Sequence, residues 1–190
     1  MPRAGRARRL FVALEVPPEV RVAVEAAFAP WRASLPTARW VPPEKNLHIT
    51  VRFLGPVRSE LVDDVGSAVE TAAATIAPFA SRLDAVGAFP SSNRARVLWA
   101  GLDDRPGRIA SLALALDAAL APTFGAEARA LRPHLTVGRC DPAARLPATF
   151  EATPLDPVSF EVVRAVVFES VSGGGGPPRY EPVAVHPLAG

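Results

Sequence analysis

Short segments of alternating or continuous apolar residues, separated by turns rich in proline and glycine, run along the chain. Residues 9–16 (RLFVALEV) are mostly apolar and stop before a Pro-Pro pair, which predicts a buried strand. Residues 47–54 (LHITVRFL) alternate between apolar and polar positions and stop at a Gly-Pro pair, which predicts a strand with one exposed face. The same criteria predict further strands at residues 83–89, 96–102, 135–138, 160–171 and 180–185.

Three other segments carry apolar residues at helical spacing. Residues 18–33 begin with a proline, which the first turn of a helix tolerates, and residues 59–77 begin with a serine. Residues 108–120 place one apolar stripe along a helix: Ile109, Leu112, Leu116 and Leu120. Because strands and helices mix without regular β-α-β alternation, the pattern predicts a single α+β domain with mainly antiparallel sheets.

Length and composition agree with one globular domain. The chain has 190 residues, of which 49% are hydrophobic, and its formal net charge of +2 is too small to indicate nucleic-acid binding by itself. No segment approaches the ~20 apolar residues of a membrane span, and the apolar run after the first arginines is too short and interrupted for a secretory signal. Cys140 is the only cysteine, so we expect no disulfide framework. These features predict a soluble, cytoplasmic protein.

One short pattern occurs twice. Residues 48–51 are His-Ile-Thr-Val and residues 134–137 are His-Leu-Thr-Val, and each copy lies in or at the edge of a predicted strand. The chain has only three histidines, and the repeat uses two of them. A repeated match of this kind carries far more weight than a single short motif, so it is the strongest indication of function in the sequence.

Strand geometry indicates what the repeat can do. Because successive side chains of a strand point to opposite faces, each histidine shares a face with the threonine two residues later. If both strands border one site, that site contains His48, Thr50, His134 and Thr136. One neutral imidazole can then accept a proton from a nucleophile, one imidazolium can protonate a leaving oxygen, and the hydroxyls can donate hydrogen bonds to phosphate oxygens. The set predicts metal-free phosphodiester chemistry, for which a strained cyclic phosphate is a suitable substrate.

Other residues are weaker candidates. Arg52 has the same parity as His48 and is predicted to contact a phosphate, whereas Phe53 has the opposite parity and is predicted to lie in the core. Arg94 and Arg96 flank a predicted turn, from which they could reach the site or solvent. Two imidazoles without cysteine ligands, and without a carboxylate on the same strand face, make a poor zinc site, so we expect no metal and no other cofactor.

The repeated motif resembles the tandem motifs of the two-histidine (2H) phosphoesterase superfamily. Within it, the chain is similar to the RNA 2′,3′-cyclic phosphodiesterases, historically called 2′-5′ RNA ligases. The likeness extends over nearly the whole chain and includes the segments RLFVALEVPPEV, WVPPEKNLHITVRFLGPV, ARVLWAGL, RPHLTVGR and VVFESV.

The resemblance implies an α+β fold of two pseudo-symmetric lobes, each a mainly antiparallel sheet with helices on its outer face, enclosing a central groove. It implies hydrolysis of a terminal 2′,3′-cyclic phosphate to a 2′-phosphate, and a related 2′-5′ ligation of RNA ends such as tRNA halves. His48 would protonate the departing 3′ oxygen, His134 would activate water, and Thr50 and Thr136 would hold the phosphate. Arg139, just beyond the second motif, would add a cationic contact.

Two other interpretations stay open at this point. The substrate could be a small cyclic nucleotide or a 2′-5′-linked oligonucleotide, because nothing in the sequence sets the size of the leaving group. The chain could instead be a non-catalytic RNA- or nucleotide-binding module, although binding alone would not require two proton-transfer groups. The four glycines at residues 173–176 replace a loop that is often polar or cationic in relatives, so a contact to RNA beyond the cyclic end could differ here. We expect a monomer.

Overall fold

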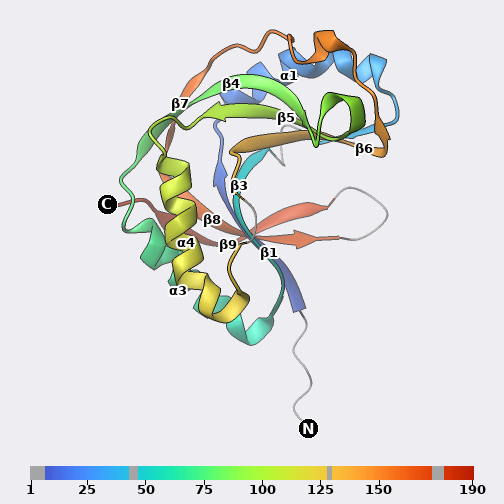
Figure 1. The fold of residues 1–190 in the computed structure, drawn as a ribbon. Helices are drawn as coiled ribbons and strands as arrows, with labels where there is room; N and C mark the ends of the chain where they lie inside the picture. The colour runs from blue at the N-terminus through green and yellow to red at the C-terminus, as the bar shows by residue number, and fades with distance from the viewer. Residues whose placement is uncertain (1–6, 43–46, 128–129, 173–177) are drawn as a thin grey trace.

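The computed structural model describes residues 7–42, 47–127, 130–172 and 178–190 (Figure 1). No helix in these ranges is both long and apolar enough to cross a membrane. The strands are β1 (Ala7–Glu15), β2 (Ala38–Trp40), β3 (His48–Arg58), β4 (Phe79–Phe89), β5 (Ala95–Asp103), β6 (His134–Ala144), β7 (Ser159–Val162), β8 (Arg164–Val171) and β9 (Arg179–Pro187). The helices are α1 (Pro18–Ser34), α3 (Val62–Ala73) and α4 (Arg108–Phe124), with short 3₁₀ turns η1 (Ser59–Leu61), η2 (Ser92–Arg94) and η3 (Ala148–Phe150).

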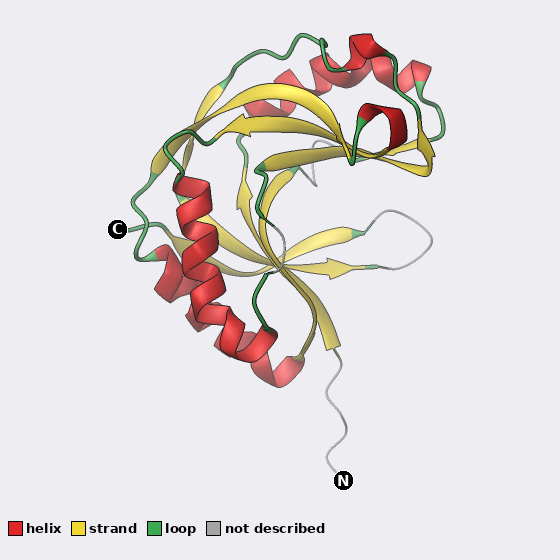
Figure 2. Cartoon of the chain, viewed as in Figure 1, coloured by secondary structure: helices red, strands yellow, loops and turns green. Residues whose placement is uncertain are grey.

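The described strands form one strongly curled sheet whose paired neighbours are antiparallel (Figure 2). Their order is β7-β4-β5-β6-β3-β1-β8-β9, and β2 pairs with β6 outside this path. We call β3, β1, β8 and β9 the β3 half, and β6, β5, β4, β7 and β2 the β6 half. The only residue pair found between β3 and β6 is Ile49 with Leu135, so the two halves meet at a single point of the ladder.

The two halves repeat one arrangement. From the meeting point outward, β3 is followed by β1, β8 and β9, and β6 is followed by β5, β4 and β7. Along the chain, β1-α1-β3 and β5-α4-β6 are equivalent units, in which the second strand carries the repeated motif. The predicted α+β fold with two pseudo-symmetric, antiparallel parts is therefore confirmed. The two parts are joined into one sheet, which curls around a concave inner face (Figure 2).

Helices cover the outer face of both halves, but each connecting helix covers the half to which it does not belong (Figure 1). Helix α1 joins two strands of the β3 half, yet its Phe28 ring lies 6.2 Å from Trp40 of β2, in the β6 half. Helix α4 joins two strands of the β6 half, yet it packs on α3 and β3. Its predicted apolar stripe is confirmed, since Ile109, Leu112 and Leu116 are fully buried. Each such side chain contributes about 1.5–3 kcal/mol when buried.

Three segments differ from the prediction. The strand expected at residues 160–171 is interrupted at Val163, and its two parts, β7 and β8, pair with β4 and β1 in different halves of the sheet. The helix expected from residue 59 begins as the 3₁₀ turn η1 and becomes α-helical at Val62. Strand β2 was not predicted, because three residues are too few to show a periodic pattern. The glycine loop at residues 173–176 lies outside the described residues.

Candidate active site

The two copies of the motif lie side by side where the halves of the sheet meet. Ile49 and Leu135 form the connecting pair, and both are fully buried toward the helices. The flanking histidines and threonines are partly exposed and share the inner face. Because the strands are antiparallel, the positions on either side of this pair place His48 opposite Thr136 and Thr50 opposite His134. The structure therefore brings together the four residues that the repeat predicted: His48, Thr50, His134 and Thr136.

A β-bulge directly follows the motif on β3. Thr50 is paired with Ala13 of β1, and the next pair joins Arg52 to Val12, so Val51 has no partner of its own. A bulge of this kind inserts one extra residue and shifts every later side chain to the other face of the strand. Parity counted from the sequence is therefore reversed at Arg52 and Phe53, until a second register shift between Phe53 and Gly55 restores it.

Strand β6 has a bulge at the equivalent place. Thr136 is paired with Trp99 of β5, and the next pair joins Gly138 to Leu98, so Val137 is the extra residue. The six residues that begin with the histidine have the same burial sequence in both strands: partly exposed, buried, partly exposed, buried, buried, exposed. Equivalent positions in the two strands therefore point the same way.

The bulge turns Arg52 away from the catalytic face. Its side chain is 4% exposed, and Nη1 lies 3.1 Å from Oδ1 of Asp117 on α4 and 3.5 Å from Oε2 of Glu127. Nη2 also donates a hydrogen bond to the carbonyl oxygen of Gly125. The prediction that Arg52 shares the face of His48 is wrong, and its guanidinium is held by protein groups instead of being available to a phosphate.

The same shift brings Phe53 and Arg139 onto the inner face. Phe53, predicted as a core residue, is 63% exposed, and its ring lies 6.0 Å from that of Phe11 on β1. Arg139 is paired with Val97, which has the same parity on β5 as Trp99, and it is exposed. Since β3 and β6 run in opposite directions, Phe53 and Arg139 lie toward opposite ends of the shared face. No local sequence signal would have placed Phe53 there.

Aromatic rings surround His48. Its imidazole lies 5.0 Å from the ring of Phe11 and 5.0 Å from that of Tyr180, which it meets edge to face at 88°. The ring of Phe168 on β8 lies 6.3 Å away. These rings belong to β1, β8 and β9, so all three aromatic neighbours come from the β3 half.

His134 has an aromatic wall of its own. The ring of Phe89 on β4 lies 5.0 Å away at 85°, and Trp99 lies 5.2 Å from Phe89. The indole of Trp99 rests on the backbone of Gly87, where an added Cβ would fall 2.2 Å from the indole carbon Cζ2. Glycine is required at this position for the indole to lie flat against β4.

Burial favours the neutral form of His134, and a hydrogen bond sets its tautomer. Its Nδ1 lies 2.7 Å from the carbonyl oxygen of Arg132, and since a carbonyl only accepts, Nδ1 carries the proton and Nε2 keeps its lone pair. Burial lowers the pKa of His134 below its ordinary value of 6.5; the hydrogen bond to Arg132 opposes this, and the positive charge of Arg139 adds to it. A neutral imidazole with a free Nε2 can act as a general base near neutral pH.

The charge of Arg139 also reaches the other half of the sheet. Burial raises the pKa of the Tyr180 hydroxyl, and Arg139 acts on it in the opposite direction. Tyr180 contacts His48, so one guanidinium lies within electrostatic range of both motif regions. An anion bound between the histidines would have this cation beside it.

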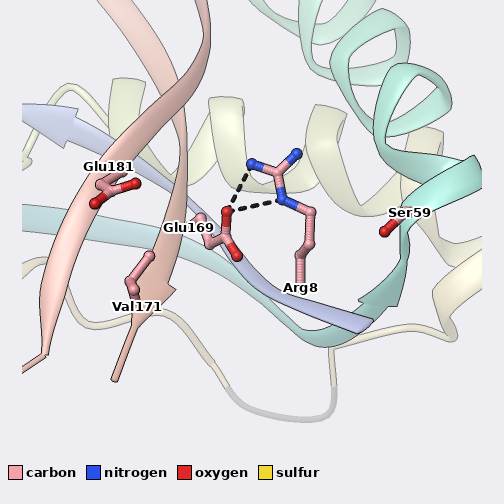
Figure 3. A pocket seen from close by; sticks show the side chains of 5 residues that line it. All are labelled: Arg8, Ser59, Glu169, Val171 and Glu181. Atoms are coloured by element: carbon pink, nitrogen blue, oxygen red, sulfur yellow. Dashed lines mark hydrogen bonds and ion pairs between the residues drawn. The ribbon is translucent and has the colours of Figure 1, made fainter. Parts of the chain in front are cut away.

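A cavity also lies away from the histidines. About 270 Å³ in volume, it is lined by Arg8, Ser59, Glu169, Val171 and Glu181 (Figure 3). Glu169 is paired with Leu10, a core residue of β1, so this cavity lies on the face of the sheet opposite to the histidines. Arg8 Nη2 forms an ion pair with Glu169 Oε2 at 2.6 Å, and Glu181 adds a second carboxylate, so the described lining of the cavity offers no unpaired cation to a phosphate. Size alone therefore does not identify the functional site. Over the described ranges, no group of three or more His, Cys, Asp or Glu residues is arranged to hold a metal ion.

Comparison with known proteins gives a consistent result. A model described as the 2′-5′ RNA ligase superfamily matches residues 17–174. An RNA 2′,3′-cyclic phosphodiesterase of Thermus thermophilus is 32% identical over 166 residues, which cover 83% of this chain and 81% of that protein. Another, of Geobacillus stearothermophilus, is 28% identical over 95% of this chain, which spans 57% of the length of that protein. The crystal structure of the Thermus thermophilus protein TT0787 has a TM-score of 0.79 and 29% identity, with 96% of this chain and 98% of that chain covered.

Proposed function

Because the chain belongs to the 2′-5′ RNA ligase superfamily, we propose that it is an RNA 2′,3′-cyclic phosphodiesterase that opens the cyclic phosphate at an RNA end to a 2′-phosphate. The observation that carries this proposal is the meeting of the two motifs at the pair Ile49–Leu135. It places two imidazoles and two hydroxyls on one face, which is the set that such a reaction requires.

In the proposed reaction, His134 is the base and His48 is the acid. Nε2 of His134 accepts a proton from a water molecule, whose oxygen attacks the phosphorus atom. The bond from phosphorus to the ribose O3′ breaks, and His48 donates its proton to that oxygen. The products are a free 3′-hydroxyl and a 2′-phosphate. The starting state returns when His134 releases the proton that it took from water and His48 takes up a proton from solvent. Each proton transfer contributes ~10²–10⁴-fold to the rate.

The remaining groups on the face bind the substrate. The hydroxyls of Thr50 and Thr136 donate hydrogen bonds to the non-bridging phosphate oxygens, and Arg139 balances their negative charge. Phe53 offers a largely exposed ring on the same face, which suits stacking of a nucleobase.

We extend the proposal to the partner and the setting. The substrates are RNAs with 2′,3′-cyclic phosphate ends, including tRNA halves, and the protein acts as a cytoplasmic monomer. The same groups can run a ligation, in which the 5′-hydroxyl of a second RNA replaces water as the nucleophile and a 2′-5′ linkage forms. Both reactions break the same bond from phosphorus to O3′.

The test is to identify the product. Purified protein in excess chelator is incubated with an oligoribonucleotide that ends in a 2′,3′-cyclic phosphate. Opening of the ring is detected by mass spectrometry, and the product is identified by chromatography against authentic 2′-phosphate and 3′-phosphate standards. A 2′-phosphate is expected. A 3′-phosphate, or activity abolished by the chelator, would contradict the proposed chemistry. If folded protein turns over small cyclic nucleotides or 2′-5′ linkages but not this RNA, the substrate assignment fails. Tight RNA binding without any turnover would identify a binding module.

A further inference from the structure

Two arginines lie directly opposite each other at one end of the catalytic face. Arg39 of β2 is paired with Arg139 of β6 in the antiparallel ladder. Side chains of directly opposite residues project from the same face, about 5 Å apart at their Cβ atoms, and like charges in such a pair destabilise the sheet. An anion bound between the two guanidinium groups would offset this repulsion.

Neighbouring pairs show which face the arginines occupy. Ala38 and Cys140, the next pair along, are both buried in the core. Trp40 and Gly138, the pair on the other side, also face the core, because a Cβ at Gly138 would lie 3.3 Å from Cε3 of Trp40. Since faces alternate along a strand, Arg39 projects from the inner face, together with Arg139 and the motif residues.

Among the described residues, protein groups neutralise this pair only weakly. The Arg39 side chain is 75% exposed, and its Nη2 lies 3.8 Å from Oδ2 of Asp141. The same carboxylate lies 3.8 Å from Nη1 of Arg96, so one exposed anion is shared between two cations. Exposed ion pairs at such distances are worth about 0–1 kcal/mol. For Arg139, no ion pair is found in the described part of the chain.

The position of Arg39 relative to the histidines suggests which anion it meets. The charge of Arg139 acts to lower the pKa of both His134 and Tyr180, so Arg139 is assigned to the phosphate under attack. Arg39 lies one strand over from Arg139, on the edge of β6 that also pairs with β3, and adjacent strands are about 4.8 Å apart. A second phosphate bound by Arg39 would thus lie beside the first, as successive phosphates of a nucleic-acid strand do.

We propose that Arg39 binds the internucleotide phosphate adjacent to the cyclic phosphate, so that the site selects oligoribonucleotide ends over 2′,3′-cyclic mononucleotides. This inference rests on the proposed function and names the substrate feature that the site recognises. A mononucleotide occupies the histidines, the threonines and Arg139 but leaves Arg39 without its anion. Arg39 is thus a specificity-determining residue outside the repeated motifs.

The test compares two substrates that differ by one nucleotide: adenosine 2′,3′-cyclic phosphate and the dinucleotide ApA with a 2′,3′-cyclic phosphate end. The native protein should have the higher kcat/KM on the dinucleotide, and Arg39→Gln should reduce this preference about tenfold or more, as expected for a lost charged hydrogen bond. The dependence of log KM on log salt concentration should also become less steep, by about one unit of slope, for the dinucleotide.

Arg179→Gln is the matched control. Arg179 is 78% exposed and lies 3.7 Å from its only ion-pair partner found in the described residues, Glu181, so its environment resembles that of Arg39. It is paired with Val171, on the face of β8 and β9 opposite to Phe168 and Tyr180. This variant removes the same charge and should leave the substrate preference unchanged. An equal loss of preference in both variants would reduce the role of Arg39 to general charge and overturn the inference.

A binding measurement separates this inference from the proposed reaction. The affinities of adenosine 2′-phosphate and of ApA ending in a 2′-phosphate are measured by calorimetry for the native protein and for Arg39→Gln. A loss of affinity in Arg39→Gln for the dinucleotide alone supports the inference, even if no turnover is found. In that case only the proposed reaction fails. Unchanged dinucleotide affinity in Arg39→Gln, or an equal loss for both ligands, overturns it.

Discussion

The two motif strands have the same backbone but carry different side chains beyond the motif. In both, histidine and threonine face inward, the aliphatic residue between them is buried, and an unpaired valine follows as a bulge. The next two positions differ: Arg52 and Phe53 on β3 correspond to Gly138 and Arg139 on β6. The repeated backbone therefore supplies the catalytic pair, and the residues after the bulge give each half a separate task.

The first of these positions concerns stability. Arg52 ties β3 to α4 and to the segment after it through Asp117 and Glu127, whereas Gly138 leaves room for Trp40 and Leu98. The second concerns the substrate, since Phe53 offers an aromatic surface and Arg139 a charge, at opposite ends of one face. A site built from two similar halves can in this way bind an asymmetric substrate in one direction.

The largest expected effect comes from replacing the two histidines of the repeated motif, which both halves of the sheet share. His48→Ala and His134→Ala should each reduce the single-turnover rate on an RNA cyclic phosphate by at least ~10²-fold. Their roles should separate on a p-nitrophenyl phosphodiester, whose leaving group needs no proton. On this substrate the rate of His48→Ala should fall much less than it does on the RNA cyclic phosphate. The rate of His134→Ala should fall by as much as before, because water still requires a base.

A reversed pattern would exchange the roles of acid and base. Equal losses for both variants on both substrates would indicate that the histidines bind the phosphate without transferring protons. Circular dichroism and thermal unfolding of each variant serve as the check on folding.

The next effect tests the stabilising position. Arg52→Leu should lower the free energy of unfolding by about 2–3 kcal/mol, measured by urea denaturation. The value is below that of a fully buried ion pair, because Asp117 and Glu127 are 31% and 36% exposed and water screens them. Loss of kcat/KM in a variant of normal stability would instead restore Arg52 as a substrate contact.

Gly138→Ala is the matched change on β6. The added Cβ would lie 3.3 Å from both Leu98 Cδ1 and Trp40 Cε3, so a cost of about 1 kcal/mol is expected from overpacking. Arg58→Gln controls for charge, since Arg58 is 69% exposed and pairs with Glu60 at 3.4 Å. Its effect should fall within about 0.5 kcal/mol.

Much of this fold follows from the sequence, because its signals are local. The prolines at residues 17 and 18 and the apolar spacing after them located α1 almost to the residue, and the stripe of α4 is buried as its periodicity predicts. Residues 160–171 are rich in apolar residues and contain no glycine or proline, but nothing within them indicates that β7 and β8 pair with strands in different halves. Pairing depends on distant partners, which a local pattern does not contain.

The site shows the same limit. His48, Thr50, His134 and Thr136 precede the bulges, so alternation from the motif placed them correctly. Arg52 follows a bulge, and parity failed there because a bulge is a feature of hydrogen bonding between two strands. Arg39 was missed for a related reason, since its strand is short and is defined only by its pairing with β6.

The smallest expected effect is a change in the pKa of His134 when the charge at the Arg139 end of the face is removed. Burial and, secondarily, the charge of Arg139 lower the pKa of His134 below 6.5, so the base stays neutral and active somewhat below that pH. Arg139→Gln removes one cause of the lowering. The pKa of His134 should therefore rise, and the acidic limb of kcat/KM should move to higher pH. Proton NMR titration of the His134 imidazole measures the shift directly, with Arg179→Gln expected to leave it in place.

The same shift has a consequence for stability. Unfolded His134 titrates near 6.5, above its folded value, so in the window below pH 6.5 the unfolded state binds more protons. Stability from this group is complete above that pH and decreases as pH falls toward the folded pKa. Urea denaturation between pH 7.5 and 5.5 should show a smaller decrease in Arg139→Gln than in the native protein. An equal decrease would mean that Arg139 does not act on His134, and the cationic end of the face would then have no effect on the pKa of the base.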